Sequence, residues 1–222
     1  MEPKIAREYY LISINPKNGY YFNFGNEFGY GILGGILMDL YREKRIAFQD
    51  KRLVVVNPSP TNYPMFDKVI EIITKKGSIK VASLIGRMAF KGMFYRREMI
   101  ELMLSNNDII RVRKKFLGIS YNRYFPTDRD FRMSLIRRVR DILLRNETPA
   151  PEELLLLALI HACQLYRALS DVREERRRMR MNMKILLKSG NNYSHDFDDI
   201  KELSSGIRKA IAAAQASHTA AI

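Results

Sequence analysis

The sequence has few of the residues that build disulfides and metal centres. Its only cysteine is Cys163, which excludes a disulfide within the chain and a zinc site made of cysteines. The three histidines, His161, His195 and His218, lie far apart and lack the spacing of paired metal ligands. Because Cys163 and His161 stand in an apolar stretch, we expect an inert buried thiol and a core histidine. The sequence therefore predicts neither a metal site nor a cofactor.

Long apolar runs are also missing. The longest, Leu154–Cys163, contains His161 and falls well short of the roughly 18 to 20 residues that a transmembrane helix needs. The first residues, Met1–Glu8, lack the apolar segment of a secretory signal. We therefore expect a protein that is made and kept in the cytoplasm.

One glycine-rich stretch suggests nucleotide chemistry. Gly29, Gly31 and Gly34 match the G-x-G-x-x-G fingerprint, and Asp50 follows at the distance of a ribose-binding acid. That fingerprint requires a βαβ unit, whereas here residues 20–24 are short and the helix leads into a hairpin. The simpler interpretation is that the glycines let a helix begin tightly and pack closely. Since no nucleophile–histidine–acid set or P-loop is recognisable, we expect no enzymatic activity.

Positive charge, in contrast, is abundant. The chain has 38 lysines and arginines against 24 acidic residues, which gives a formal net charge of +14. A molecule with this charge is attracted to polyanions. Anionic membranes and nucleic acids both qualify, and charge alone does not choose between them.

The pattern of apolar residues predicts a compact, mainly α-helical single domain over residues 1–222 with two or three peripheral β-hairpins. Two hairpins are expected at 45–56, with Asp50 and Lys51 in the turn, and at 109–125. A third would join the strand-like segments 9–14 and 20–22. The expected helices are 31–43, 65–76, 79–90, 95–106, 127–145, 152–169, 173–188 and one that begins near 197–200.

The order of these motifs resembles the Golgi-phosphoprotein-3 family over nearly the whole chain. The resemblance begins with the aromatic loop before the glycine-rich helix and continues through five segments, Tyr30–Leu40, Val54–Thr61, Arg97–Leu104, Leu154–Cys163 and Ile207–Ala214. It implies a non-enzymatic peripheral membrane protein that binds phosphoinositide-like anionic headgroups. Eukaryotic members of the family bind phosphatidylinositol-4-phosphate.

The resemblance also implies where the headgroup binds. In the family, a loop aromatic, an arginine in the first turn of the glycine helix and a basic pair three residues apart form the pocket. Here Phe24 stands at the aromatic position and Arg97 at the second basic position, whereas Leu33 and Phe94 occupy the other two. We therefore expect a less selective anion site, which Arg96, Arg87 and Lys91 would complete. The alternative is that the two neighbouring arginines form an ordinary solvated helix face.

Two further segments carry competing interpretations. The basic helix expected at 173–188 could lie along nucleic-acid phosphates, or it could be the charged exterior of a packed helix whose Met179 and Met183 face the core. The hairpin expected at 109–125 has several apolar residues that look exposed. Because this hairpin supports self-association in the resembled family, we expect a homo-oligomer.

Overall fold

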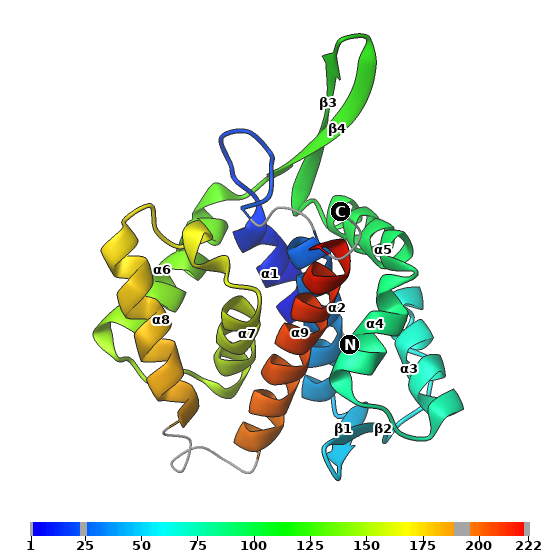
Figure 1. The fold of residues 1–222 in the computed structure, drawn as a ribbon. Coiled ribbons are helices and arrows are strands. Elements are labelled where there is room, and N and C mark those ends of the chain that lie inside the picture. Colours follow the sequence, from blue (N-terminus) through cyan, green and yellow to red (C-terminus); the bar gives the residue numbers. More distant parts are fainter. Residues whose placement is uncertain (1, 23–25, 189–195, 220–222) are drawn as a thin grey trace.

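The computed structural model describes residues 2–22, 26–188 and 196–219 (Figure 1). It confirms a mainly α-helical fold with small antiparallel hairpins. In chain order the elements are α1 (Lys4–Ser13), α2 (Asn26–Arg42), β1 (Ile46–Gln49), β2 (Arg52–Val55), α3 (Pro64–Lys76), α4 (Val81–Ala89), α5 (Gly92–Ser105), β3 (Ile109–Phe116), β4 (Ile119–Pro126), α6 (Arg129–Arg145), α7 (Pro151–Ala162), the 3-10 helix η1 (Leu165–Ala168), α8 (Arg173–Lys188) and α9 (Asp196–Thr219).

Helix α2 is the central element, and α1, α4, α7 and α9 pack around it (Figure 1). All residues from 31 to 40 are buried. A Cβ atom at Gly35 would lie 2.7 Å from the Cα of Ala6 in α1, and one at Gly34 would lie 2.8 Å from Ile207 in α9. The glycines therefore serve close helix packing, as the simpler interpretation of the sequence expected.

Helix α1 corrects one prediction. Residues 9–14 and 20–22 were expected to form a hairpin, but 4–13 are helical and only an isolated bridge joins Ile14 to Tyr21. The aromatic and β-branched residues of this segment favour a strand in isolation. Burial of both faces of α1 by neighbouring helices overrides that local preference.

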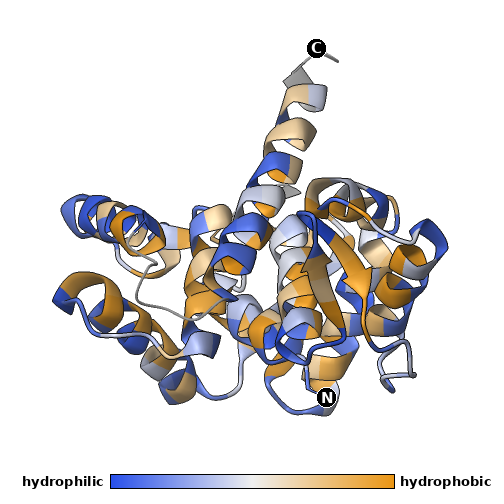
Figure 2. Cartoon of the chain, turned by 90° about the horizontal axis from the view of Figure 1, so that it is seen from below, coloured by the Kyte–Doolittle hydropathy of each residue, from blue (hydrophilic) through white to orange (hydrophobic). Residues whose placement is uncertain are grey.

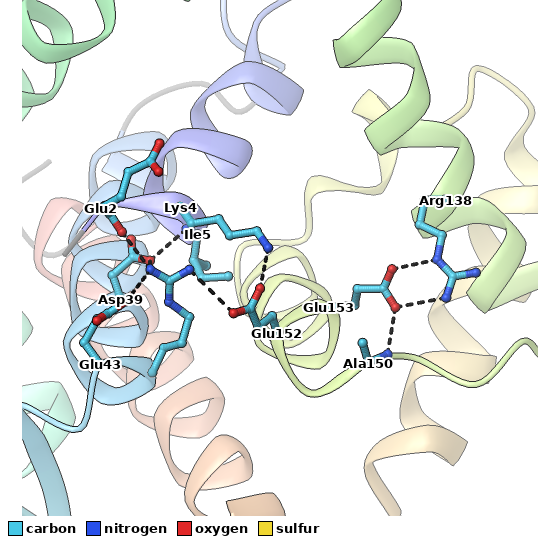
Figure 3. A network of polar contacts seen from close by, with 10 residues as sticks. Glu2, Lys4, Ile5, Asp39, Glu43, Arg138, Ala150, Glu152 and Glu153 are labelled. Carbon is cyan, nitrogen blue, oxygen red and sulfur yellow. Dashed lines mark hydrogen bonds and ion pairs between the residues drawn. The ribbon is translucent and has the colours of Figure 1, made fainter. Parts of the chain in front are cut away.

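Side chains from distant parts of the chain hold both ends of α1. Asp39 of α2 is completely buried and accepts a backbone hydrogen bond from Ile5 at 2.9 Å (Figure 3). It accepts a second from the backbone N–H of Ala6 at 3.0 Å. Arg132 of α6, only 4% exposed, donates to two carbonyl oxygens in the last turn of α1, at 3.0 and 3.2 Å. Both ends of this helix therefore have partners for backbone groups that a helix leaves unsatisfied.

Charged side chains at the start of α7 join three helices (Figure 3). Glu152 forms an ion pair with Lys4 of α1, and this hydrogen bond lowers the pKa of Glu152. Glu153 accepts hydrogen bonds from Arg138 of α6 at 2.6 and 3.0 Å, and from the backbone N–H of Ala150 at 2.7 Å. Two carboxylates at a helix N-terminus also interact favourably with the positive end of the helix dipole.

The two hairpins lie at opposite ends of the view in Figure 1. The turn between β1 and β2 has positive φ angles at Asp50 (50°) and Lys51 (59°), which confirms the predicted turn. Strands β3 and β4 pair from Ile109 opposite Pro126 to the tip, and they project away from the helices.

Most predicted helices are confirmed with shifted ends. Helix α2 begins five residues before the predicted start at 31, and α7 ends at Ala162 because Gln164 adopts a left-handed conformation. Asp128 caps α6 by accepting the backbone N–H of Phe131 at 2.8 Å. Figure 2 shows hydrophobic residues on the helix faces that meet in the interior and hydrophilic residues on the outer turns.

Candidate anion-binding site

Arg96 of α5 rests on a platform of aromatic rings. Its guanidinium carbon lies 5.4 Å from the ring centroid of Tyr21 and 5.6 Å from that of Phe28. These two rings stack with centroids 3.6 Å apart, and Tyr10 meets both of them edge-on. The arrangement attracts a cation to the faces of the rings and limits where the guanidinium can point.

Two hollows flank Arg96, and Met93 and Arg96 line both. The smaller, about 210 Å³, lies between the first turns of α2 and the junction of α4 with α5. The larger, about 560 Å³, lies between α5 and β4 and is also lined by Arg97, Asn122 and Tyr124. Phe28 and Gly29, in the first turn of α2, line the smaller hollow.

The acidic residues near these hollows interact with side chains other than Arg96. Glu101 lines the larger hollow but pairs with Arg111 at 2.6 Å, and Glu98 reaches Arg97 only at 3.8 Å. Glu27, in the first turn of α2, accepts a hydrogen bond from Gln215. Among the residues that the structure describes, no carboxylate forms an ion pair with Arg96. Its charge is therefore available to an anionic ligand.

The structure brings some of the predicted site residues together. Arg96 and Arg97 both line the larger hollow, and the side chain of Arg97 is 71% exposed. Arg87, in the last turn of α4, and Lys91, just before α5, are exposed at the junction of these helices but line neither hollow. Phe24 lies outside the described residues.

Leu33 and Phe94 stand at the two positions where the family pattern has a cation, and both lie in apolar surroundings in the structure. Leu33 is 3% exposed and lines the smaller hollow, so it cannot bind phosphate. Arg96 lines the same hollow and brings positive charge to it. Phe94 is half-buried and packs edge-on against Tyr95 at 5.2 Å between centroids. The site therefore has a different set of cations from the one that the family pattern implies.

Sequence reasoning missed the aromatic platform under Arg96. The density of aromatic residues between 20 and 30 was visible, but only Phe24 was selected from it. Tyr21 and Phe28 come from opposite sides of the aromatic loop, and Arg96 lies about seventy residues further along the chain. Only the folded arrangement shows that these three side chains meet.

Burial keeps the side chains of His161 and Cys163 in unreactive states. Burial lowers the pKa of His161 to about 4, and its Nδ1 lies 2.5 Å from the hydroxyl of Tyr166. Burial raises the pKa of Cys163 to about 12. The imidazole is therefore neutral and the thiol protonated near pH 7, which confirms the expected core histidine and buried cysteine.

Helix α8 packs against the core with its methionines, as expected from the interpretation of this segment as the charged exterior of a packed helix. Met179 and Met183 are fully buried, and Arg180 lies over the ring of Tyr166 at 5.5 Å. Arg176 donates to the carbonyl oxygens of residues 170 and 171 at 3.0 and 2.7 Å. The outer turns still expose several cations, so α8 is a charged exterior on a packed helix.

Within the described ranges, the structure contains neither a cluster of metal ligands nor a membrane-spanning helix. No group of three or more histidine, cysteine or acidic side chains is placed there to hold a metal ion. No helix there combines the length and the apolar character that crossing a bilayer requires.

Comparison with known proteins identifies the family. A search of curated proteins found no match to the chain. The family model described as Golgi phosphoprotein 3 (GPP34) matches residues 5–216. That match includes every described element from α1 to most of α9, together with the aromatic platform and Arg96. The chain therefore belongs to the Golgi phosphoprotein 3 family.

Proposed function

We propose that this protein is a non-enzymatic, peripheral membrane protein of the cytoplasm that binds the phosphate groups of anionic phospholipids. The observation that carries the proposal is Arg96, an exposed guanidinium on an aromatic platform between two hollows. Membership of the Golgi phosphoprotein 3 family supports a membrane-related role. The net charge of +14 supports attraction to an anionic surface.

The chemistry of the site suits a phosphate monoester. A guanidinium donates two parallel hydrogen bonds to phosphate oxygens, and its contact with the rings of Tyr21 and Phe28 orients it before binding. Arg97 adds a second guanidinium beside the larger hollow, while Arg87 and Lys91 add charge nearby. Phe24 is proposed as the aromatic that enters the bilayer interface. Because Leu33 and Phe94 replace two cations, we expect modest selectivity for phosphatidylinositol-4-phosphate over other anionic lipids.

Vesicle co-sedimentation tests the proposal. The protein is mixed with vesicles of phosphatidylcholine alone, or with added phosphatidylserine or phosphatidylinositol-4-phosphate. We expect recovery only with the anionic vesicles, and loss of most of it in the double variant Arg96→Glu with Arg97→Glu. The matched control is Arg177→Glu with Arg178→Glu, which makes the same charge change on the exposed side of α8.

The two variants separate a site from a general charge effect. If both reduce recovery equally, the attraction is diffuse and Arg96 has no special role. Equal recovery of the unaltered protein with neutral and anionic vesicles would remove the electrostatic basis of the proposal altogether.

A nucleic-acid-binding role is the second candidate, because α8 exposes Arg177, Arg178, Lys184 and Lys188 on its outer side. None of these four cations pairs with a carboxylate of the described residues. Fluorescence anisotropy with duplex DNA over a salt series tests it, since phosphate neutralisation predicts steep weakening as salt rises. Strong binding that the α8 variant abolishes would favour this role over lipid binding.

We also propose that the protein self-associates through the β3–β4 hairpin. Its tip exposes Phe116 (67%), Leu117 (85%) and Ile119 (72%), which is more apolar surface than an isolated monomer ordinarily presents at one place. Symmetric contact between two tips would remove these side chains from water.

A further inference from the structure

The junction between α4 and α5 carries the most exposed large apolar side chains that the structure describes. Phe90, just after α4, is 94% exposed, and Met93, in the first turn of α5, is 89% exposed. Single exposed apolar residues are ordinary on protein surfaces. Phe90 and Met93, however, lie three residues apart and are both almost completely in water. Together they concentrate exposed apolar surface at one place, and neither side chain packs into the core.

The surroundings of this junction are purely basic in sequence. Between Glu71 and Glu98 the chain has no acidic residue, although it has seven lysines and arginines at positions 75, 76, 80, 87, 91, 96 and 97. In the described structure, Arg87, Lys91 and Arg96 form no ion pair with a carboxylate. From neighbouring elements, Glu101 lines the larger hollow and forms an ion pair with Arg111. Glu27, in the first turn of α2, accepts a hydrogen bond from the neutral side chain of Gln215. The apolar pair therefore has three cations nearby, Arg87 and Lys91 on either side of Phe90 in the chain and Arg96 beside Met93, which form no ion pair with a described carboxylate.

The apolar pair is continuous with the candidate anion site. Met93 lines both hollows beside Arg96, and Phe90 lies between Arg87 and Lys91 in the chain. A protein partner would have to match apolar and basic groups side by side at this junction. An anionic bilayer offers both at once, because its charged headgroups lie directly over its apolar chains.

We propose that the side chains of Phe90 and Met93 together form an insertion wedge. This wedge enters the boundary between headgroups and acyl chains of an anionic bilayer while Arg96 and Arg97 bind lipid phosphates. The inference rests on the proposed lipid-binding function and adds the element that penetrates the membrane. The cations at 87 and 91 then lie at headgroup level on either side of Phe90. The geometry thus separates two tasks, because the arginines recognise phosphate and the wedge adds affinity that salt does not screen.

The absence of tryptophan makes the wedge directly observable. The sequence contains no tryptophan, so Phe90→Trp creates a single fluorescent reporter at the tip of the proposed wedge. On binding vesicles that contain phosphatidylserine, we expect its emission to shift to the blue and to be quenched by lipids brominated on the acyl chains. The control is Val56→Trp, a 58% exposed position after β2 that should show neither effect. Co-sedimentation of the same samples shows how much protein is bound.

The possible outcomes distinguish failure of the wedge proposal from failure of the proposed lipid-binding function. Bound protein whose tryptophan at position 90 keeps a water-exposed spectrum would overturn the wedge and leave headgroup binding intact. Failure to bind any anionic vesicle would overturn both. Insertion reported by Leu117→Trp at the hairpin tip, without insertion at position 90, would also overturn the wedge in favour of the hairpin.

A second variant tests the wedge without a reporter. Replacing Phe90, which lines neither hollow, by serine should lower partitioning onto anionic vesicles by about tenfold, since its apolar side chain no longer enters the bilayer. Binding of soluble inositol 1,4-bisphosphate, measured by calorimetry, should stay within about twofold because Arg96 and Arg97 are unchanged. Because the side chain of Phe90 is 94% exposed, thermal stability should also be unaffected. Unchanged partitioning in this variant would contradict the proposal.

Discussion

The close contact between α1 and α2 at Gly35 predicts a large effect from one added methyl group. A Cβ atom at this position would lie 2.7 Å from the Cα of Ala6, 3.0 Å from its Cβ and 3.1 Å from its backbone nitrogen. Because the obstacle is mainly backbone, no side-chain rotation can relieve it. Helix α1 as a whole would have to move away from α2, and it is fixed by Asp39 and Arg132.

The magnitude follows from two opposing contributions. Overpacking a buried site of this kind costs about 1–3 kcal/mol or more, and the rigid backbone favours the upper part of that range. Replacing glycine by alanine inside a helix gains about 0.5–1 kcal/mol in helix propensity. For Gly35→Ala we therefore expect a net loss of about 1–3 kcal/mol in the free energy of unfolding.

A matched substitution isolates the packing contribution. Gly86 lies inside α4, where an added Cβ would meet nothing within 4 Å. Gly86→Ala should therefore raise the free energy of unfolding by about 0.5–1 kcal/mol. Urea denaturation followed by circular dichroism measures both variants, and the slope against urea should remain that of the unaltered protein. If Gly35→Ala were as stable as Gly86→Ala, the close approach of α1 to α2 would be refuted.

Three further predictions concern burial, charge and assembly. Burial raises the pKa of Asp39 to about 7 from an ordinary 3.8, so the folded protein retains a proton that the unfolded chain releases. The contribution of Asp39 is therefore complete below about pH 4 and falls by up to ~4 kcal/mol as the pH rises to about 7. The difference in free energy of unfolding between the unaltered protein and Asp39→Ala, measured by urea denaturation, should therefore narrow between about pH 4 and pH 7; a difference that widens over this range would contradict the prediction. Arg132→Met should lower stability by about 1–3 kcal/mol, because it leaves two buried carbonyl oxygens without a donor, and a thermal midpoint equal to that of the unaltered protein would count against this capping role. Replacing Phe116 and Leu117 by serine should convert an oligomer to a monomer in sedimentation velocity, whereas an unchanged sedimentation coefficient would place any association elsewhere.

The sequence predicted most helices well because their apolar residues repeat at helical spacing. The segments at 65–76, 127–145 and 173–188 correspond to α3, α6 and α8 within two residues at each end. Asp50 and Lys51 were recognisable as a turn from their place between two strand-like runs. These features depend on neighbours in the chain, which a sequence displays directly.

The failures depend on contacts with distant residues. The strand expected at 9–14 is the second half of a helix whose aromatic residues are buried against α2, and nothing in the local pattern reveals that burial. The candidate site was predicted only in part for the same reason. Arg96 and Arg97 could be selected from the sequence, whereas the platform of Tyr21 and Phe28 depends on the fold.

The two long-range caps of α1 also determine when this helix can become complete during synthesis. Its first-turn amide groups gain their acceptor once α2 has been made, but its last carbonyl groups need Arg132, which is encoded after more than half of the chain. A nascent chain that stops before α6 therefore carries an N-terminal helix with an open end and an uncovered apolar side. Ribosome-bound fragments should accordingly expose this segment to chaperones or proteases until α6 has emerged.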